Sequence, residues 1–136
     1  MNNYQIFIEY DGTDFVGWQI QKNGPSIQEV VQIALKRYFK KKVILKGAGR
    51  TDAGVHAYRQ SASFCTEEKI KSKNSFINSV NFFLKKYRIS IIELKNRKID
   101  FHARFSAKKR IYKYLIINRE GALSIDKNRG WLIKKK

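Results

Sequence analysis

Residues 43–64 read VILKGAGRTDAGVHAYRQSASF, which is a short apolar run, a glycine-rich loop and an alternating segment. The run from Val43 to Leu45 predicts a strand. A second strand is predicted after the loop, because side chains alternate there in the order Tyr58, Arg59, Gln60, Ser61, Ala62, Ser63, Phe64. The loop itself, residues 47–59, holds three glycines, Arg50 and Asp52, so it is too polar to be core. The sequence therefore predicts two strands joined by a loop that carries an arginine close to a carboxylate.

The segments before the loop predict a strand and then a helix. Residues 4–10 alternate with a period of two, which is typical of a strand with one more apolar face. Residues 11–18 combine turn formers with aromatic side chains that we expect to be exposed. Ser26 and Glu29 form a capping box at the start of a predicted helix. Its apolar residues recur at three-and-four spacing: Ile27, Val30, Val31, Ala34, Leu35, Tyr38 and Phe39.

The segments after the loop repeat this succession. Apolar residues between 76 and 87 predict a second helix, and the branched run from Ile89 to Leu94 predicts a fourth strand. The order strand, helix, strand, strand, helix, strand is a split βαβ pattern. It predicts an α+β fold of the ferredoxin-like kind, in which an antiparallel sheet carries its helices on one face. The other face of the sheet is left open for a ligand.

Two domains are expected, 1–105 with the glycine-rich loop and 106–136 as the start of an incomplete second domain. A polar connector begins at about Lys95, near the end of the first domain. Residues 110–117 predict a strand with Arg110, Tyr112, Tyr114 and Ile116 on one face, and this strand has no sheet of its own. The residues after it mix turn formers with a basic end and predict no clear element.

The charge distribution favours a polyanionic partner. The formal net charge is +18, and 28 of the 29 Lys and Arg residues follow residue 35. Phosphate groups are the natural counterpart of such a surface, so nucleic acid is the favoured partner, ahead of an anionic membrane surface or a merely solubilising charge. The basic residues are spread over strands and helices rather than gathered on one amphipathic helix, which also favours nucleic acid.

Cysteine usage and the amino terminus bear on the cellular compartment. Cys65 stands alone, so neither an internal disulfide nor a cysteine-built zinc site can form, and a reducing compartment fits. The opening MNNYQIFIEY has no signal-peptide pattern, and no stretch is apolar enough to span a membrane. We therefore expect a cytoplasmic protein with no membrane partner.

Asp52 has two interpretations from its immediate surroundings alone. An Asp before Ala-Gly in a loop is commonly a turn residue bonded to its own backbone, with Arg50 as a solvated neighbour. Gly47, Gly49 and Gly54 favour a functional interpretation, because they let the backbone approach a bulky ligand closely. Residue types alone leave this choice open.

Three stretches resemble the tRNA pseudouridine synthase A family. GAGRTDAGVHA at 47–57 is similar to the family's signature, IEYDGTDFVGWQIQKNGPSIQEVVQIAL at 8–35 to its amino-terminal stretch, and DFHARFSAKKRIYKY at 100–114 to its second signature. The resemblance extends over about residues 4–117, in the family's order and spacing. It implies half of a pseudouridine synthase fold and a cofactor-free isomerase that converts uridine to pseudouridine at positions 38–40 of the tRNA anticodon arm.

The resemblance also implies roles for three side chains. Asp52 matches the catalytic carboxylate that attacks the target uridine or its ribose. Tyr112 matches an active-site tyrosine that stacks on the base, whereas Tyr114 on the same strand face could be ordinary core. Arg50 would fill the stack that the extruded base vacates or clamp a phosphate, or it would keep Asp52 ionised as a charge partner. Both roles of Arg50 can hold together.

Further residues of the motifs are candidates for tRNA binding. His56 is expected to orient the loop, and His102 with Arg104 to contact RNA or brace the connector. Neither histidine has a carboxylate or cysteine at a metal-ligand spacing, so we expect no metal. The predicted substrate-binding residues are Gly49, Thr51, Gly54, His56, Arg59, His102, Arg104 and Arg110. Other basic residues expected along the tRNA path are Lys46, Lys108, Lys109 and Lys113, any of which could be a plain surface charge.

The resemblance weakens near the carboxyl end. Family members carry a second half that completes the cleft, supplies a basic partner to the aspartate and helps to form a homodimer; GWLIKKK does not look like its natural continuation. We therefore expect either a shortened synthase without full activity or one whose second half is another chain. A non-catalytic basic RNA-binding module with an open sheet is the alternative from a different class.

Overall fold

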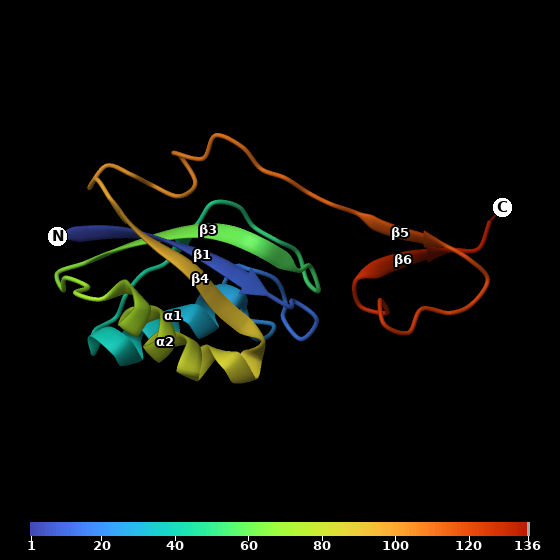
Figure 1. The fold of residues 1–136 in the computed structure, drawn as a ribbon, viewed down its shortest axis with the longest axis horizontal. Coiled ribbons are helices and arrows are strands. Elements are labelled where there is room, and N and C mark those ends of the chain that lie inside the picture. Colours follow the sequence, from blue (N-terminus) through green and yellow to red (C-terminus); the bar gives the residue numbers. More distant parts are fainter. Residues whose placement is uncertain (136) are drawn as a thin grey trace.

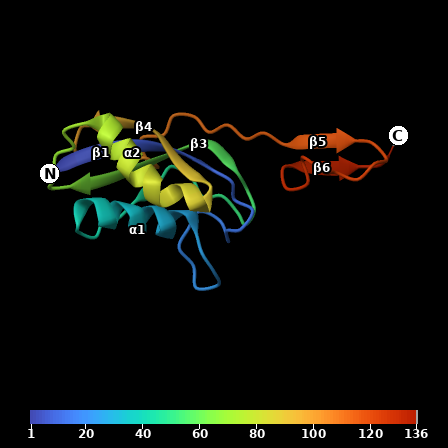
Figure 2. The same ribbon diagram turned by 60° about the horizontal axis from the view of Figure 1, so that its bottom comes forward.

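The computed structural model describes residues 1–135, so Lys136, the last residue of the expected second domain, lies outside the described residues. The main body is a four-stranded antiparallel sheet with both helices on one face (Figures 1 and 2). Its strands, in the order β2-β3-β1-β4, are β1 (Asn2–Tyr10), β2 (Lys46–Gly47), β3 (Ala57–Thr66) and β4 (Ile89–Arg97). The helices are α1 (Ile27–Phe39) and α2 (Lys73–Leu84), the latter followed by a 3-10 turn at Lys85–Tyr87. The structure confirms the predicted α+β class.

The core lies between the sheet and the helices. The side chains of the central strand β1 that face the helices, Tyr4, Ile6, Ile8 and Tyr10, are all buried, as the alternation predicts. An aromatic cluster of Phe39, Phe64 and Phe76 joins α1, β3 and α2. Burial of these apolar surfaces is the main favourable contribution to folding.

A serine hydroxyl caps the amino-terminal end of each helix. The Ser26 hydroxyl accepts from the Glu29 amide at 3.2 Å, which is the first half of the predicted capping box. Helix α1 ends at Lys40, whose φ of 60° places it in the left-handed region. The Ser72 hydroxyl accepts from the Ser75 amide, so α2 begins three residues earlier than the predicted boundary at residue 76.

Two local predictions were wrong. Residues 43–45 form no strand, because the side-chain amides of Gln32 and Gln28 in α1 bind the Leu45 backbone N–H and carbonyl at 2.9 and 2.8 Å, and β2 begins only at Lys46. The aromatic side chains of residues 11–18 are not exposed. Phe15 and Trp18 are buried at 8% and 2% exposure, since this segment folds over the edge of the core.

The connector and the carboxyl-terminal segment also differ from expectation. The connector folds back on the open sheet face, where the Asn3 side chain donates to the carbonyls of Lys98 and Phe101, both at 2.8 Å, so that face is partly covered. The predicted strand 110–117 is shorter and shifted, as β5 (Leu115–Asn118), and it does have a partner: β6 (Gly130–Ile133) pairs with it in parallel. This two-stranded unit projects from the body (Figure 1). Among the described residues, no helix is both long and apolar enough to cross a bilayer.

A candidate active-site cleft beside the glycine-rich loop

The glycine-rich loop is held at its start by continuation of the sheet pairing. After β2 the Ala48 amide donates to the Ser61 carbonyl at 2.8 Å, and the Gln60 side chain donates to the Gly49 carbonyl at 2.6 Å. Gly47 packs on the Trp18 indole so closely that a Cβ would lie 2.6 Å from the ring. Arg50 therefore leaves the sheet edge from a fixed backbone.

The segment 11–18 holds the middle of the loop. The Trp18 amide donates to the Thr51 carbonyl at 3.0 Å, the Gly54 amide donates to the Phe15 carbonyl, and Gly17 forms a bridge with Asp52. Gly17 has a φ of +118°, and a Cβ there would lie 2.5 Å from the Thr51 carbonyl oxygen. Only glycine allows this approach. The sequence interpretation missed this supporting role, although Gly17, which lies between Phe15 and Trp18, was a visible signal for it.

A buried hydroxyl positions the residue between Arg50 and Asp52. The Tyr10 Oη and Thr51 Oγ1 lie 2.8 Å apart in a hydrogen bond. Burial raises the pKa of Tyr10, and the Thr51 bond offsets part of that rise, so the phenol stays protonated at neutral pH. Tyr10, which the sequence placed only in a strand, thus belongs to the support of the loop.

A cleft of about 590 Å³ opens next to this loop. Its wall brings together residues that are distant in the sequence, from the end of segment 11–18 and the residue after it, α1, β2, the loop and the connector: Trp18, Gln19, Gln28, Lys46, Gly47, Ala48, Gly49, Arg50, His102, Arg104, Arg110 and Tyr112. The cleft combines basic side chains with aromatic surfaces, which is the composition that binds extruded bases and phosphates.

Arg110 fastens the connector to the loop. Its guanidinium donates to the Ala48 carbonyl at 2.9 and 3.3 Å and to the Arg104 carbonyl at 3.4 Å. A Cβ on Gly49 would lie 3.6 Å from the Arg110 Nε and 4.0 Å from the Tyr112 hydroxyl. Three predicted site residues, Gly49, Arg110 and Tyr112, are thereby brought together.

His102 lies in the same cleft in its neutral form. Its Nδ1 accepts from the Arg104 amide at 3.1 Å, so the proton of the neutral ring resides on Nε2. Burial first, and then the positive charges of Lys46 and Arg104, lower the pKa of His102 below its ordinary value. Among the described residues, the cleft wall holds Lys46, Arg50, Arg104 and Arg110 and no carboxylate, so its charge would favour an anionic ligand.

Comparison with known proteins places these features in a family. A sequence model of the family described as tRNA pseudouridine synthase matches residues 6–106. The chain belongs to this family. A tRNA pseudouridine synthase A of Pelagibacter ubique (strain HTCC1062) is 52% identical over the whole chain, which covers 55% of that protein. Proteins of the same name from Ehrlichia ruminantium (strain Welgevonden) and Parvibaculum lavamentivorans are 47% and 41% identical, over 96% and 99% of this chain and 53% and 54% of their own lengths. The chain thus spans about half the length of the curated relatives it matches.

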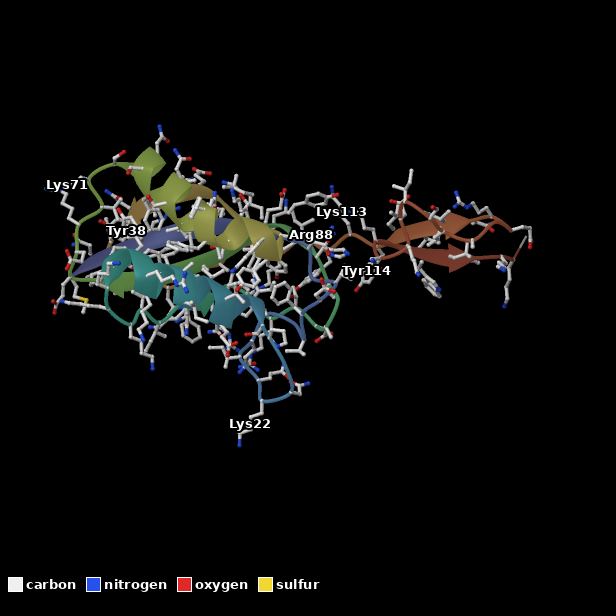
Figure 3. All side chains as sticks on the ribbon, turned by 90° about the horizontal axis from the view of Figure 1, so that it is seen from below. Lys22, Tyr38, Lys71, Arg88, Lys113 and Tyr114 are labelled. Atoms are coloured by element: carbon white, nitrogen blue, oxygen red, sulfur yellow. The ribbon has the colours of Figure 1, made fainter. Side chains whose placement is uncertain are left out.

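The three residues that were predicted to be catalytic lie differently with respect to the cleft. Arg50 and Tyr112 line it, whereas Asp52 does not. The Asp52 side chain is exposed, and within residues 1–135 its carboxylate has no hydrogen-bond or ion-pair partner, so the alternative in which Arg50 pairs with it directly is not formed. Tyr114 is 86% exposed on the stretch that joins the body to β5 (Figure 3), which rules out the alternative that it is core.

The remaining predicted binding residues are dispersed. His56 lies outside the cleft wall, with both ring nitrogens bonded to the protein. Arg59 stacks 3.9 Å over the Phe7 ring on the open sheet face and forms an ion pair with Glu93, and Gly54 makes a turn at φ +79°. In the part of the chain that the structure describes, no three His, Cys, Asp or Glu side chains gather to hold a metal ion.

Proposed function

We propose that this chain carries the catalytic loop of a tRNA-uridine isomerase that forms pseudouridine at positions 38–40 of the anticodon arm. One observation carries the proposal: the family's signature loop is fastened at Ala48, Gly49 and Thr51 to the edge of a basic, aromatic cleft. Preorganised placement of reacting groups is what such a reaction requires, because it needs no cofactor and depends on geometry.

Asp52 is the proposed catalytic carboxylate. It would add to the uridine ring or its ribose, or stabilise positive charge on the sugar, while the bond between the base and the ribose C1′ breaks. The detached uracil then turns and rejoins through carbon. Exposure and lack of a partner leave the Asp52 oxygens free to meet a nucleotide. Since Asp52 does not line the cleft wall, we propose that the second half of a full-length synthase closes the site over it.

Arg50 and Tyr112 are proposed to hold the extruded nucleotide. The Arg50 guanidinium, exposed at the cleft wall, would replace the base in the stack or clamp the neighbouring phosphate. The Tyr112 ring, 64% exposed, offers an aromatic surface for the base.

Other residues are proposed to contact the tRNA or to support the loop. Arg104, His102 and Lys46 would meet phosphates, and Arg59 would do so from the open sheet face. Gly49, Thr51, Gly54 and Arg110 are proposed to act at the same site through backbone shape and the hydrogen bonds described above. His56 would affect tRNA binding only by orienting the loop, because both of its ring nitrogens already make hydrogen bonds within the protein.

The larger organisation is also a proposal. Residues 1–105 would form the loop-bearing domain and 106–136 the beginning of a second one, in line with the separation of β5 and β6 from the body. We propose that the protein is a cytoplasmic homodimer that acts on tRNA. Sedimentation of the purified chain tests the dimer. Exposed apolar side chains on the projecting unit, Leu115, Ile116 and Trp131, favour burial against further protein.

A substrate-side control tests the function. The chain is incubated with unmodified tRNA tritiated at uracil C5, where isomerisation releases the label, and with a matched tRNA that has cytidine at 38–40. Release from the first tRNA alone supports the proposal. Tight, salt-sensitive binding of both tRNAs without release from either would instead support the non-catalytic RNA-binding module.

A further inference from the structure

Both ring nitrogens of His56 make hydrogen bonds, and the partners determine where its proton lies. The Gly12 amide can only donate, so Nδ1 accepts from it at 2.9 Å. The Asn128 carbonyl can only accept, so Nε2, at 2.5 Å, carries the proton. This arrangement selects the neutral Nε2–H tautomer. It also connects three separate segments: the glycine-rich loop, the turn after β1 and residues 119–129 between β5 and β6, which we term the return loop.

Asp11 lies at the same junction and joins the return loop through Arg129, because the His56 Nδ1 already acts as an acceptor for Gly12. One of its carboxylate oxygens lies 3.2 Å from the His56 Nδ1 and accepts from both the amide and the hydroxyl of Thr13. The other faces Arg88 at 3.4 Å and Arg129 of the return loop at 3.9 Å. The Asp11 side chain is only 19% exposed. Asp11 thus faces three groups that carry or can carry positive charge: His56, Arg88 and Arg129.

In the described part of the chain, the polar contacts between the return loop and the body lie at this one place. Within residues 1–135, the hydrogen bonds and ion pairs that join residues 115–135 to residues 1–114 are the contacts of Asn128 with His56 and of Arg129 with Asp11. The β5–β6 unit otherwise extends away from the sheet and helices (Figures 1 and 2). Among the residues that the structure describes, His56 thus supplies the one hydrogen bond across this interface.

We propose that His56 is a positioning residue that clamps the return loop to the loop that carries Asp52. His56 follows Asp52 by four residues, and β5 directly continues the segment that holds Arg110 and Tyr112. Fixing the return loop therefore restrains the two walls of the cleft relative to each other. The link to catalysis rests on the proposed function, whereas the clamp itself does not.

The two nitrogens can be tested separately. In His56→Asn, the side-chain oxygen can replace Nδ1 as acceptor for Gly12 but cannot reach Asn128. In His56→Gln, the longer amide can replace the Nε2 donor but not the Nδ1 acceptor. We expect His56→Asn to speed amide exchange of Arg129 and Gly130 about tenfold, as loss of one hydrogen bond allows, and to leave Gly12 protected. His56→Gln should do the reverse.

Three results would overturn the clamp. The first is amide exchange that is unchanged in both variants. The second is equally faster exchange at Gly12 and at Arg129 and Gly130 in both variants, which indicates a general destabilisation. The third needs no variant, so it holds even if a variant fails to fold: ¹⁵N NMR of the wild-type ring should show the Nε2–H tautomer, and the Nδ1–H tautomer contradicts the geometry.

Activity provides a separate readout. In single-turnover reactions on tRNA, His56→Asn should lower the rate constant while the tRNA dissociation constant stays within about twofold of wild type, because His56 does not line the cleft. Weaker tRNA binding with an unchanged rate constant would contradict a positioning role. If the wild-type chain alone forms no pseudouridine, the activity readout is lost, and the exchange and NMR results still decide the clamp.

Discussion

Replacing Gly17 with alanine should destabilise the protein by displacing the backbone of the glycine-rich loop. The new Cβ would lie 2.5 Å from the Thr51 carbonyl oxygen, where ordinary contact begins at 3.4 Å, so the two backbones must separate by about 0.9 Å. The φ of +118° adds strain of about 1–3 kcal/mol for a residue with a side chain. Weakening of the hydrogen bond from Trp18 to Thr51 adds about 1 kcal/mol.

The expected cost is therefore about 2–4 kcal/mol in the free energy of unfolding, measured by urea denaturation with tryptophan fluorescence. Gly54→Ala is the matched control. Gly54 also has a positive φ, +79°, but no atom lies within 4 Å of a Cβ there. It should lose only the strain, about 1–2 kcal/mol. If Gly17→Ala costs no more than Gly54→Ala, the close packing of segment 11–18 on the loop is refuted.

Three further predictions concern the support, the pH dependence and the charge of the site. Tyr10→Phe should cost about 1 kcal/mol of stability, and a double-mutant cycle with Thr51→Val should recover that energy as coupling. The pKa of Asp11 is lowered, first by the hydrogen bond from the Thr13 hydroxyl and then by the Thr13 amide, His56 and Arg88, while burial opposes them. The ionised Asp11 therefore stabilises the folded protein at neutral pH, and this contribution is lost as the pH falls through the lowered pKa. Urea unfolding at pH 7 and about pH 3 should therefore show a smaller loss for Asp11→Asn than for wild type. Arg104→Ala should reduce the slope of log affinity for tRNA against log salt by roughly 0.7–0.9.

Local periodicity was enough to predict the main body. The alternation at residues 4–10 and the capping box at Ser26 lead directly to β1 and α1, because each pattern depends on neighbours within one turn or one pleat. Non-local partners explain the failures. The Leu45 backbone bonds to side chains of α1, and β5 finds β6 across the return loop, so neither could be read from the local pattern.

The sequence predicted which residues belong to the candidate site better than it predicted how they are arranged in space. The loop and the second signature indicated Gly49, Arg50, Arg110 and Tyr112, which the structure brings to one cleft. Their mode of attachment was not visible, since the Arg110 bond to Ala48 and the burial of Trp18 depend on how the connector and segment 11–18 fold over the sheet edge. The placement of Asp52 outside the cleft wall likewise depends on backbone direction rather than on residue type.

The central claim is that the Asp52 carboxylate reacts with the nucleotide. The most direct test is the single-turnover rate of pseudouridine formation with protein in excess over tRNA, so that differences in binding cancel. Asp52→Asn keeps the shape of the side chain, and Asp100→Asn, at an exposed position of the connector, makes the same change of charge. We predict a loss of at least about 10³-fold for Asp52→Asn and a rate near wild type for Asp100→Asn. Pseudouridine formed by Asp52→Asn at close to the wild-type rate would contradict the account.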